Sequence, residues 1–164
     1  MAISAERLAR GDFSPDGTFE KSVTGRCRPA EVMAAFVTIE GQKRWFTDVK
    51  DGRWVSGTPE AVGGVRQLAL GGPLWTRHQL TRIEPGKRVE YLLLESSTGM
   101  PIQGGRIVVT IESDAPSLDE VGLTTVRIDF RYVLMTPFKL MKGQIQKRVA
   151  ESLGGGVERL VRGG

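Results

Sequence analysis

Hydrophobic and polar residues alternate in two stretches of the second half of the chain. The apolar residues that share one face of residues 125–132 are Val126, Ile128, Phe130 and Tyr132. Residues 106–112 repeat the pattern, with isoleucine and valine at every second position. A period of two is typical of strands with one buried and one solvated face, which antiparallel sheets permit. The pattern therefore predicts an antiparallel sheet.

Other strand-like runs are separated by glycine and proline turns, such as Gly71-Gly72-Pro73. The predicted strands lie near residues 19–26, 53–57, 63–70, 75–84, 88–96, 104–112 and 123–133. Residues 28–46 predict two short helices, because Pro29 suits a first helical turn and Gly41 can separate the pair.

Residues 137–162 predict one long amphipathic helix. The apolar positions that fall in one stripe, at about 100° per residue, are Phe138, Met141, Ile145, Val149, Leu153, Val157 and Leu160. The stripe keeps its phase through three consecutive glycines, 154–156, although an interior glycine costs about 1 kcal/mol relative to alanine. Gly156 falls near the middle of the stripe, and Gly155 points away. The missing side chains would allow close packing, form a soft joint or leave room for a ligand.

This order of elements predicts an α+β domain. A curved antiparallel sheet of about six or seven strands carries two short helices, and the long C-terminal helix covers its concave side. One helix cannot fill a wide, curved sheet, so we expect a cavity beneath it. We expect residues 1–18 to form an N-terminal extension and residues 19–162 to form a single domain.

Composition narrows the class of protein. Of 164 residues, 40% are hydrophobic and 26% are charged, and no apolar run is long enough to span a bilayer. The N-terminal residues lack the apolar core of a signal peptide. Cys27 is the only cysteine, which excludes an internal disulfide and suits a reducing compartment. We therefore expect a cytoplasmic protein with no integral membrane segment.

Part of the net charge of +4 is concentrated in residues 138–162. A basic helix can contact nucleic acid or an anionic membrane surface, but a solvated helix face has the same pattern. No nucleic-acid-binding motif accompanies these charges, so we expect no nucleic-acid partner.

Five segments carry a resemblance to a known family through their order and spacing. They are CRPAEVMAAF (27–36), GQKRWF (41–46), VGGVRQLAL (62–70), HQLTRIEPGKRVEYLLL (78–94) and GLTTVRIDFRY (122–132). Together they resemble the START-type helix-grip proteins, specifically the polyketide cyclase/dehydrase and lipid-transport branch of the SRPBCC superfamily. The resemblance spans about residues 19–162 and implies a cavity roofed by the final helix. The family's functions are diverse, so the resemblance implies function only by analogy.

His78 is the only histidine and the natural candidate for acid–base chemistry. Strand alternation places it on one face with Thr76 and Leu80. A lone strand histidine is more often structural, so His78 is only a weak catalytic candidate. One histidine and one cysteine do not make a metal site without carboxylates, and no phosphate-binding loop or nucleophile elbow is present. We expect no metal and no cofactor.

The predicted ligand-binding residues combine strand side chains with residues of the last helix. They are Trp75, His78, Tyr91, Phe130, Tyr132, Met141, Lys142 and Ile145. Buried tyrosine and tryptophan side chains pack a ring and still offer one polar group. Lys142 would either meet an acidic ligand group or extend its ammonium into water. Arg66, in the glycine–arginine strand, would form a salt bridge or bind the ligand.

The sequence favours a protein that binds a hydrophobic or amphipathic small molecule. Two alternatives stay open: a cyclase- or dehydratase-type enzyme in which His78 or Tyr91 moves a proton, and a membrane-associated lipid or quinone carrier. Leu92 and Leu94 alternate onto the face opposite Tyr91. If exposed, they would join two subunits in a homodimer.

Overall fold

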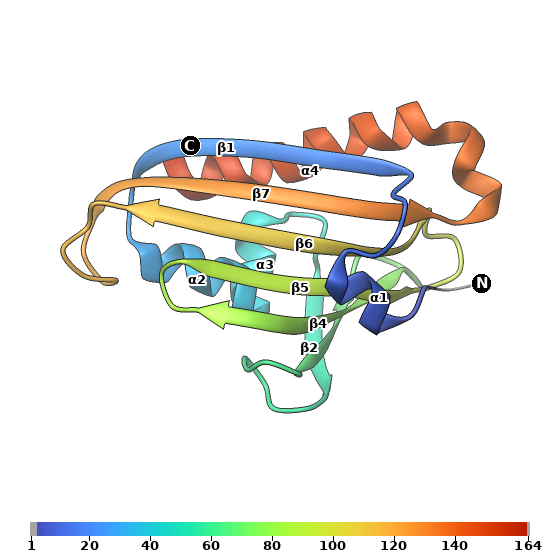
Figure 1. Ribbon diagram of the computed structural model, residues 1–164, viewed down its shortest axis with the longest axis horizontal. Helices are drawn as coiled ribbons and strands as arrows, with labels where there is room; N and C mark the ends of the chain where they lie inside the picture. The colour runs from blue at the N-terminus through green and yellow to red at the C-terminus, as the bar shows by residue number, and fades with distance from the viewer. Residues whose placement is uncertain (1–2, 164) are drawn as a thin grey trace.

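One antiparallel sheet of seven strands, in the order β1-β7-β6-β5-β4-β3-β2, forms the framework of the molecule (Figure 1). The computed structural model describes residues 3–163. Its strands are β1 (Gly17–Cys27), β2 (Asp51–Ser56), β3 (Val65–Ala69), β4 (Trp75–Glu84), β5 (Arg88–Ser96), β6 (Ile102–Ser113) and β7 (Gly122–Leu134). Its helices are α1 (Ala5–Arg10), α2 (Pro29–Val37), α3 (Ile39–Trp45), α4 (Lys142–Arg162) and the 3₁₀ helix η1 (Thr136–Met141). The predicted antiparallel sheet and its strands are confirmed.

The first and last strands of the chain pair over the whole of β1, which forms one edge of the sheet. Phe19 lies opposite Phe130, and Val23 lies opposite Val126. Burial in β7 alternates residue by residue, as its sequence pattern predicts. The inner face of the sheet is therefore built from the apolar half of each strand.

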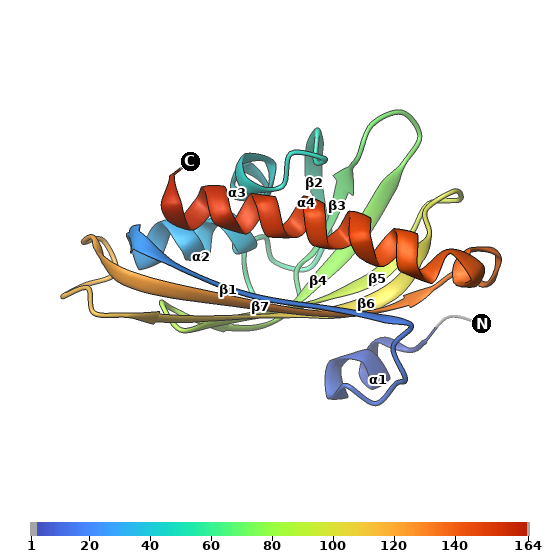
Figure 2. The same ribbon diagram turned by 90° about the horizontal axis from the view of Figure 1, so that it is seen from above.

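The sheet curves toward α4, which crosses its inner face (Figure 2). The helices α2 and α3 lie on the same side, and α3 contacts α4. The short helix α1 lies on the opposite, outer face. This arrangement confirms the predicted helix-grip fold. No helix within residues 3–163 combines the length and the apolar character needed to cross a bilayer.

The last helix begins five residues later than predicted. Residues 136–141 form the 3₁₀ helix η1, which has about three residues per turn instead of 3.6, so the predicted stripe loses its phase there. Met141 is consequently 44% exposed instead of facing the sheet. From Lys142 onward α4 is continuous, and the three glycines interrupt neither its hydrogen bonding nor its direction.

The outer face of the sheet is partly covered by α1. This helix contacts β5 and β6, and its apolar residue Leu8 is buried. Leu92 on β5 is also buried, at 1% exposure. Leu92 therefore does not meet the condition of exposure set for a contact between two subunits, because the N-terminal segment lies over that part of the sheet.

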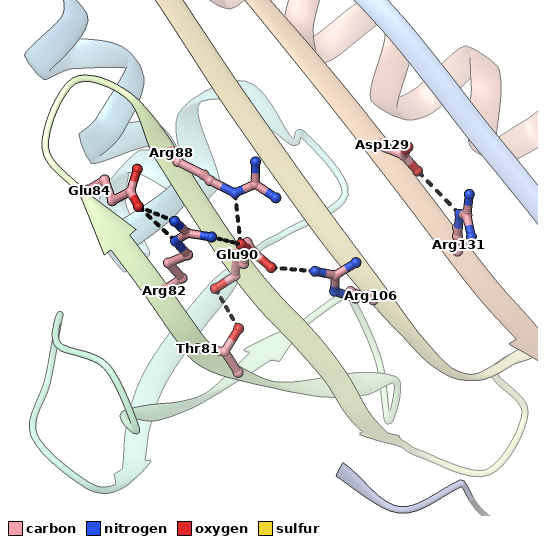
Figure 3. A network of polar contacts seen from close by, with 8 residues as sticks. All are labelled: Thr81, Arg82, Glu84, Arg88, Glu90, Arg106, Asp129 and Arg131. Carbon is pink, nitrogen blue, oxygen red and sulfur yellow. Dashed lines mark hydrogen bonds and ion pairs between the residues drawn. The ribbon is translucent and has the colours of Figure 1, made fainter. Parts of the chain in front are cut away.

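Further along the outer face, Glu90 contacts Arg88 on its own strand and two arginines of the neighbouring strands β4 and β6 (Figure 3). Its carboxylate lies 2.6 Å from Arg106 Nη2, 2.7 Å from Arg88 Nε and 3.4 Å from Arg82 Nη1. Burial raises the pKa of Glu90, but hydrogen bonds from Arg88 and Arg106 outweigh this effect and lower it overall. Glu90 therefore stays ionised and ties β4, β5 and β6 together.

Candidate ligand-binding site

A cavity of about 330 Å³ lies between the inner face of the sheet, α3 and α4. Side chains from β4, β5, β6 and β7 form its floor, and α4 forms its roof. The lining residues are Gln42, Trp45, Phe46, Asp48, Leu70, Leu74, Thr76, His78, Tyr91, Leu93, Gly99, Met100, Pro101, Ile102, Ile107, Ile128, Phe130, Ile145, Arg148, Val149, Ser152 and Leu153. Most of this surface is apolar, which suits a hydrophobic molecule.

Strand alternation and the helix stripe position the apolar walls. Ile107 and Phe130 are neighbours across the β6–β7 ladder, and both point inward. Ile145 and Val149, one helical turn apart on α4, face them from above. These apolar walls are therefore a direct consequence of the periodicities read from the sequence.

One end of the cavity is polar. His78 Nε2 lies 3.3 Å from Thr76 Oγ1, and the His78 ring lies 5.2 Å from the Tyr91 ring. His78 Nδ1 is buried and has no hydrogen-bond partner within residues 3–163. Burial lowers the pKa of His78 well below its ordinary value of 6.5, and the nearby charge of Arg66 lowers it further. His78 is therefore neutral near pH 7.

Arg66 lies behind this polar end, directly opposite His78 in the β3–β4 register. Its Nη1 donates to the carbonyl oxygens of Phe36 at 2.7 Å and Val37 at 2.9 Å, at the end of α2. Its guanidinium carbon lies 5.0 Å from the centre of the Tyr91 ring. Burial lowers the pKa of Arg66 to about 10, so the side chain remains charged at neutral pH.

The salt bridge considered for Arg66 is not formed. Within residues 3–163, no acidic side chain pairs with it, and its Nε and Nη2 atoms have no hydrogen-bond partner. The reason is tertiary: β3 brings Arg66 against the carbonyl end of α2, where backbone acceptors take the place of a carboxylate.

A second polar group lies where α3 and α4 approach each other. Ser152 Oγ donates to Asp48 Oδ2 at 3.0 Å, and Arg148 reaches the same edge from α4. Arg148 is exposed to solvent. This edge is therefore polar and hydrated, in contrast to the buried polar end at His78.

Four of the eight predicted ligand-binding residues line the cavity. They are His78, Tyr91, Phe130 and Ile145. All four lie on inward faces that the strand and helix periods predict. The other four lie outside the lining, and each has a specific structural reason.

Trp75 lies on the other face of β4, where its ring stacks on Arg77 with a guanidinium-to-centroid distance of 4.8 Å. Alternation from His78 places Trp75 on this face, so Trp75 lies outside the cavity lining. Tyr132 is buried at the end of β7 against Phe130, with ring centres 5.0 Å apart, but it does not reach the cavity.

Met141 and Lys142 lie at the junction of η1 and α4, outside the cavity. Lys142 Nζ approaches the Asp16 carboxylate at 3.9 Å, and the side chain is half-exposed. The change from 3₁₀ to α geometry rotates both residues away from the sheet. Lys142 therefore lies outside the cavity lining.

Some lining residues that the sequence analysis did not assign to the site lie on faces that alternation and the helix stripe already marked as apolar. They include Ile107, Ile128 and Val149. Others come from loops and from α3. Leu70 and Leu74 flank the turn between β3 and β4, and the β5–β6 connection supplies Gly99 to Pro101. Gln42 reaches the cavity from α3. Loop positions carry no periodic signal, so only the folded chain shows which of them face the cavity.

Cys27 is buried, and burial raises the pKa of its thiol. It is therefore a neutral core residue and not an activated nucleophile. Among residues 3–163, no group of three His, Cys, Asp or Glu side chains is placed to hold a metal ion.

Residues 16–162 match the family model described as "Polyketide cyclase / dehydrase and lipid transport". The matched segment contains every residue that lines the cavity. The chain belongs to this family. The predicted membership of the SRPBCC superfamily is thereby confirmed.

Solved structures share the fold of this family member at low sequence identity. The crystal structure of Ara h 8.0201 has a TM-score of 0.63 at 15% identity, covering 88% of this chain and 95% of that chain. A START superfamily protein from Mycobacterium smegmatis has a TM-score of 0.64 at 12% identity, covering 88% and 96%. A solution NMR structure from Thermobifida fusca has a TM-score of 0.59 at 18% identity, covering 87% and 92%.

The TM-scores show that these proteins share the fold of the SRPBCC domain. The low sequence identities leave the ligand open. No curated protein sequence matches the chain. The chemistry of the ligand must therefore be argued from the cavity itself.

Proposed function

We propose that this SRPBCC protein binds one hydrophobic or amphipathic small molecule in the cavity beneath α4. The observation that carries the proposal is a cavity of about 330 Å³ with apolar walls and a buried polar end. A cavity of this size is within the range of small-molecule sites, in which apolar contacts supply affinity and a few polar groups fix orientation.

The apolar walls account for the expected strength of binding. A ligand that buries about 200 Å² of apolar surface gains roughly 5 kcal/mol, at about 25 cal/mol per Å². Part of this gain offsets the loss of rotational and translational freedom on binding. A gain of about 5 kcal/mol corresponds to a Kd of roughly 0.2 mM, so a ligand held by apolar contact alone should bind in the submillimolar range or more weakly.

The membership in a family named for polyketide cyclisation and lipid transport supports a hydrophobic ligand class. We also place the protein in the cytoplasm, since its single cysteine, Cys27, is a free buried thiol. A hydrophobic compound made or carried in that compartment is the expected ligand.

The first test is native mass spectrometry of freshly purified protein, with solvent extraction of any passenger. In parallel, the neutral dye N-phenyl-1-naphthylamine is titrated into protein stripped of lipid. We expect saturable binding of one dye per chain. Protein that carries no passenger and binds no dye would contradict the proposal.

A matched pair of variants on α4 locates the dye. Val149→Trp fills the cavity from its roof and should weaken dye binding at least tenfold. Lys147→Trp adds the same ring on the exposed face of the same helix and should leave binding unchanged. Equal binding by both variants would place the dye outside the cavity, provided that circular dichroism shows both to be folded.

A further inference from the structure

The most unusual side chain near the cavity is Arg66, a fully buried cation without a buried carboxylate. Its exposed fraction is 0%, and within residues 3–163 it forms no ion pair. One of its terminal nitrogens is satisfied by two backbone carbonyls at the end of α2. The other terminal nitrogen and Nε have no partner in that part of the chain.

The carbonyl end of α2 compensates this charge only in part. A helix terminus acts as roughly half an elementary charge. Buried ions are normally paired and fully hydrogen-bonded, because removing a charge from water is costly. Arg66 therefore leaves a net positive potential at the polar end of the cavity.

Arg66 is adjacent to two side chains that line the cavity, so its positive potential extends into this end of the cavity. Arg66 lies over the Tyr91 ring at 5.0 Å and opposite His78 in the strand register. His78 is neutral, so it cannot neutralise or share the charge, and its buried Nδ1 has no partner among residues 3–163. Hydroxyl and amide groups of Tyr91, Thr76 and Gln42 surround the same end.

The one acidic side chain among the described lining residues is elsewhere. Asp48 lies at the α3–α4 edge, where it accepts a hydrogen bond from Ser152 and shares the edge with exposed Arg148. The buried end at His78 and Tyr91 thus combines hydrogen-bonding groups with uncompensated positive charge. Such an end favours an anionic acceptor and disfavours a cation.

We propose that the ligand carries an anionic oxygen, a carboxylate or a phenolate, which it places against His78 and Tyr91 above Arg66. Its apolar body extends along Ile107, Phe130 and Val149. The proposal rests on the proposed function, because it names the ligand class for the same cavity. Arg66 acts as a positioning residue through its charge, and the polar contacts come from the residues that line the cavity.

The test uses three probes with one naphthalene ring and different charges: naphthalene-2-carboxylate, 2-naphthalenemethanol and 2-naphthylmethylamine. Each is titrated by calorimetry at neutral pH and, separately, used to displace N-phenyl-1-naphthylamine. Two unit charges several ångströms apart in a partly buried site interact strongly enough to change affinity about tenfold or more. We expect the carboxylate to bind about tenfold more tightly than the alcohol and the ammonium to bind weakest.

An alcohol that binds as tightly as the carboxylate would overturn this inference while leaving the proposed function intact. If none of the three probes displaces the dye and the dye itself fails to bind, the proposed function fails instead. These comparisons use the natural protein and do not depend on any variant folding.

Variants then identify the source of the preference. Arg66→Gln should abolish the preference for carboxylate over alcohol, and Arg66→Lys, which keeps the charge, should retain most of it. Arg148→Gln tests the alternative position of the anion, because Arg148 is the exposed cation at the other edge of the cavity. A preference lost in Arg148→Gln but kept in Arg66→Gln would place the anion at that edge and overturn the assignment.

Discussion

Gly156 of α4 lies directly against the backbone of Trp45, the last residue of α3. A Cβ atom at position 156 would overlap the Trp45 carbonyl oxygen and would lie 2.7 Å from Cε3 of its ring. Trp45 is 2% exposed, and its Nε1 donates to the Ala35 carbonyl at 2.9 Å, so it cannot move aside easily. The close approach of α3 and α4 therefore requires a residue without a side chain.

The substitution Gly156→Ala should lower the free energy of unfolding by about 1–3 kcal/mol, because overpacking outweighs the better helix propensity of alanine. Urea unfolding followed by circular dichroism measures this change. Gly155→Ala is the control, since its Cβ would meet only the flexible end of Arg159, at 3.4 Å. That variant should gain up to about 1 kcal/mol, and an equal loss in both variants would contradict close packing as the role of Gly156.

His78 should make the stability of the protein depend on pH just below neutrality. The pKa of His78 is lowered well below 6.5 in the folded state, so below that pH the unfolded chain binds a proton that the folded chain excludes. The free energy of unfolding should therefore fall with pH by up to about 1.4 kcal/mol per unit. The stability contributed by neutral His78 is fully present above pH 6.5, and it is lost as the pH falls from 6.5 toward the lowered pKa of the folded state.

The measurement is urea unfolding of the natural protein and of His78→Gln between about pH 5 and 8. The variant should lack the added slope, and the two curves should converge in shape above the ordinary histidine pKa. Parallel curves throughout would mean that His78 titrates normally in the folded protein.

Glu90 should be the most important charge on the outer face. Glu90→Gln keeps the size of the side chain but removes the charge that holds Arg82, Arg88 and Arg106, so we expect a loss of about 1–3 kcal/mol. Glu84→Gln is the control, because that carboxylate is 40% exposed and, among the described residues, forms an ion pair with Arg82 alone. The control should lose less than about 1 kcal/mol in the same thermal or urea unfolding assay.

The short helix α1 should depend on one side chain for its position. A six-residue helix is not stable alone, and Leu8 is its only buried residue. Leu8→Ala should release α1 locally, so trypsin should cleave after Arg7 and Arg10 several-fold faster while the sheet stays folded. Ala5→Ser, at an exposed position of the same helix, should leave the cleavage rate unchanged.

The strands, the helices and their buried faces could be predicted largely from the sequence. The alternation in residues 125–132 and the stripe from Ile145 to Val157 are local properties of the chain, because backbone geometry fixes the periods of strands and helices. The inward position of Phe130 and Ile145 follows from those periods. Met141 is an exception to the predicted stripe, because a short 3₁₀ segment shifts the helical phase before α4 begins.

The cavity depends on contacts between segments far apart in the chain. The sequence shows an arginine in a strand beside glycines, but only the packing of β3 against α2 brings Arg66 to the Phe36 and Val37 carbonyls instead of a carboxylate. The positions of Leu70, Leu74 and Gly99 in the cavity likewise depend on how loops fold over the sheet.

The sequence by itself determined the fold class and which faces of β7 and α4 turn inward, because these follow from local periodicity and the order of elements, and it indicated the family through the resemblance of five segments. The tertiary structure alone decided that Gly156 serves close packing, that Leu92 is covered and that a buried charge lies behind His78. Those outcomes depend on distances between residues separated by tens of positions, and no local pattern encodes such distances.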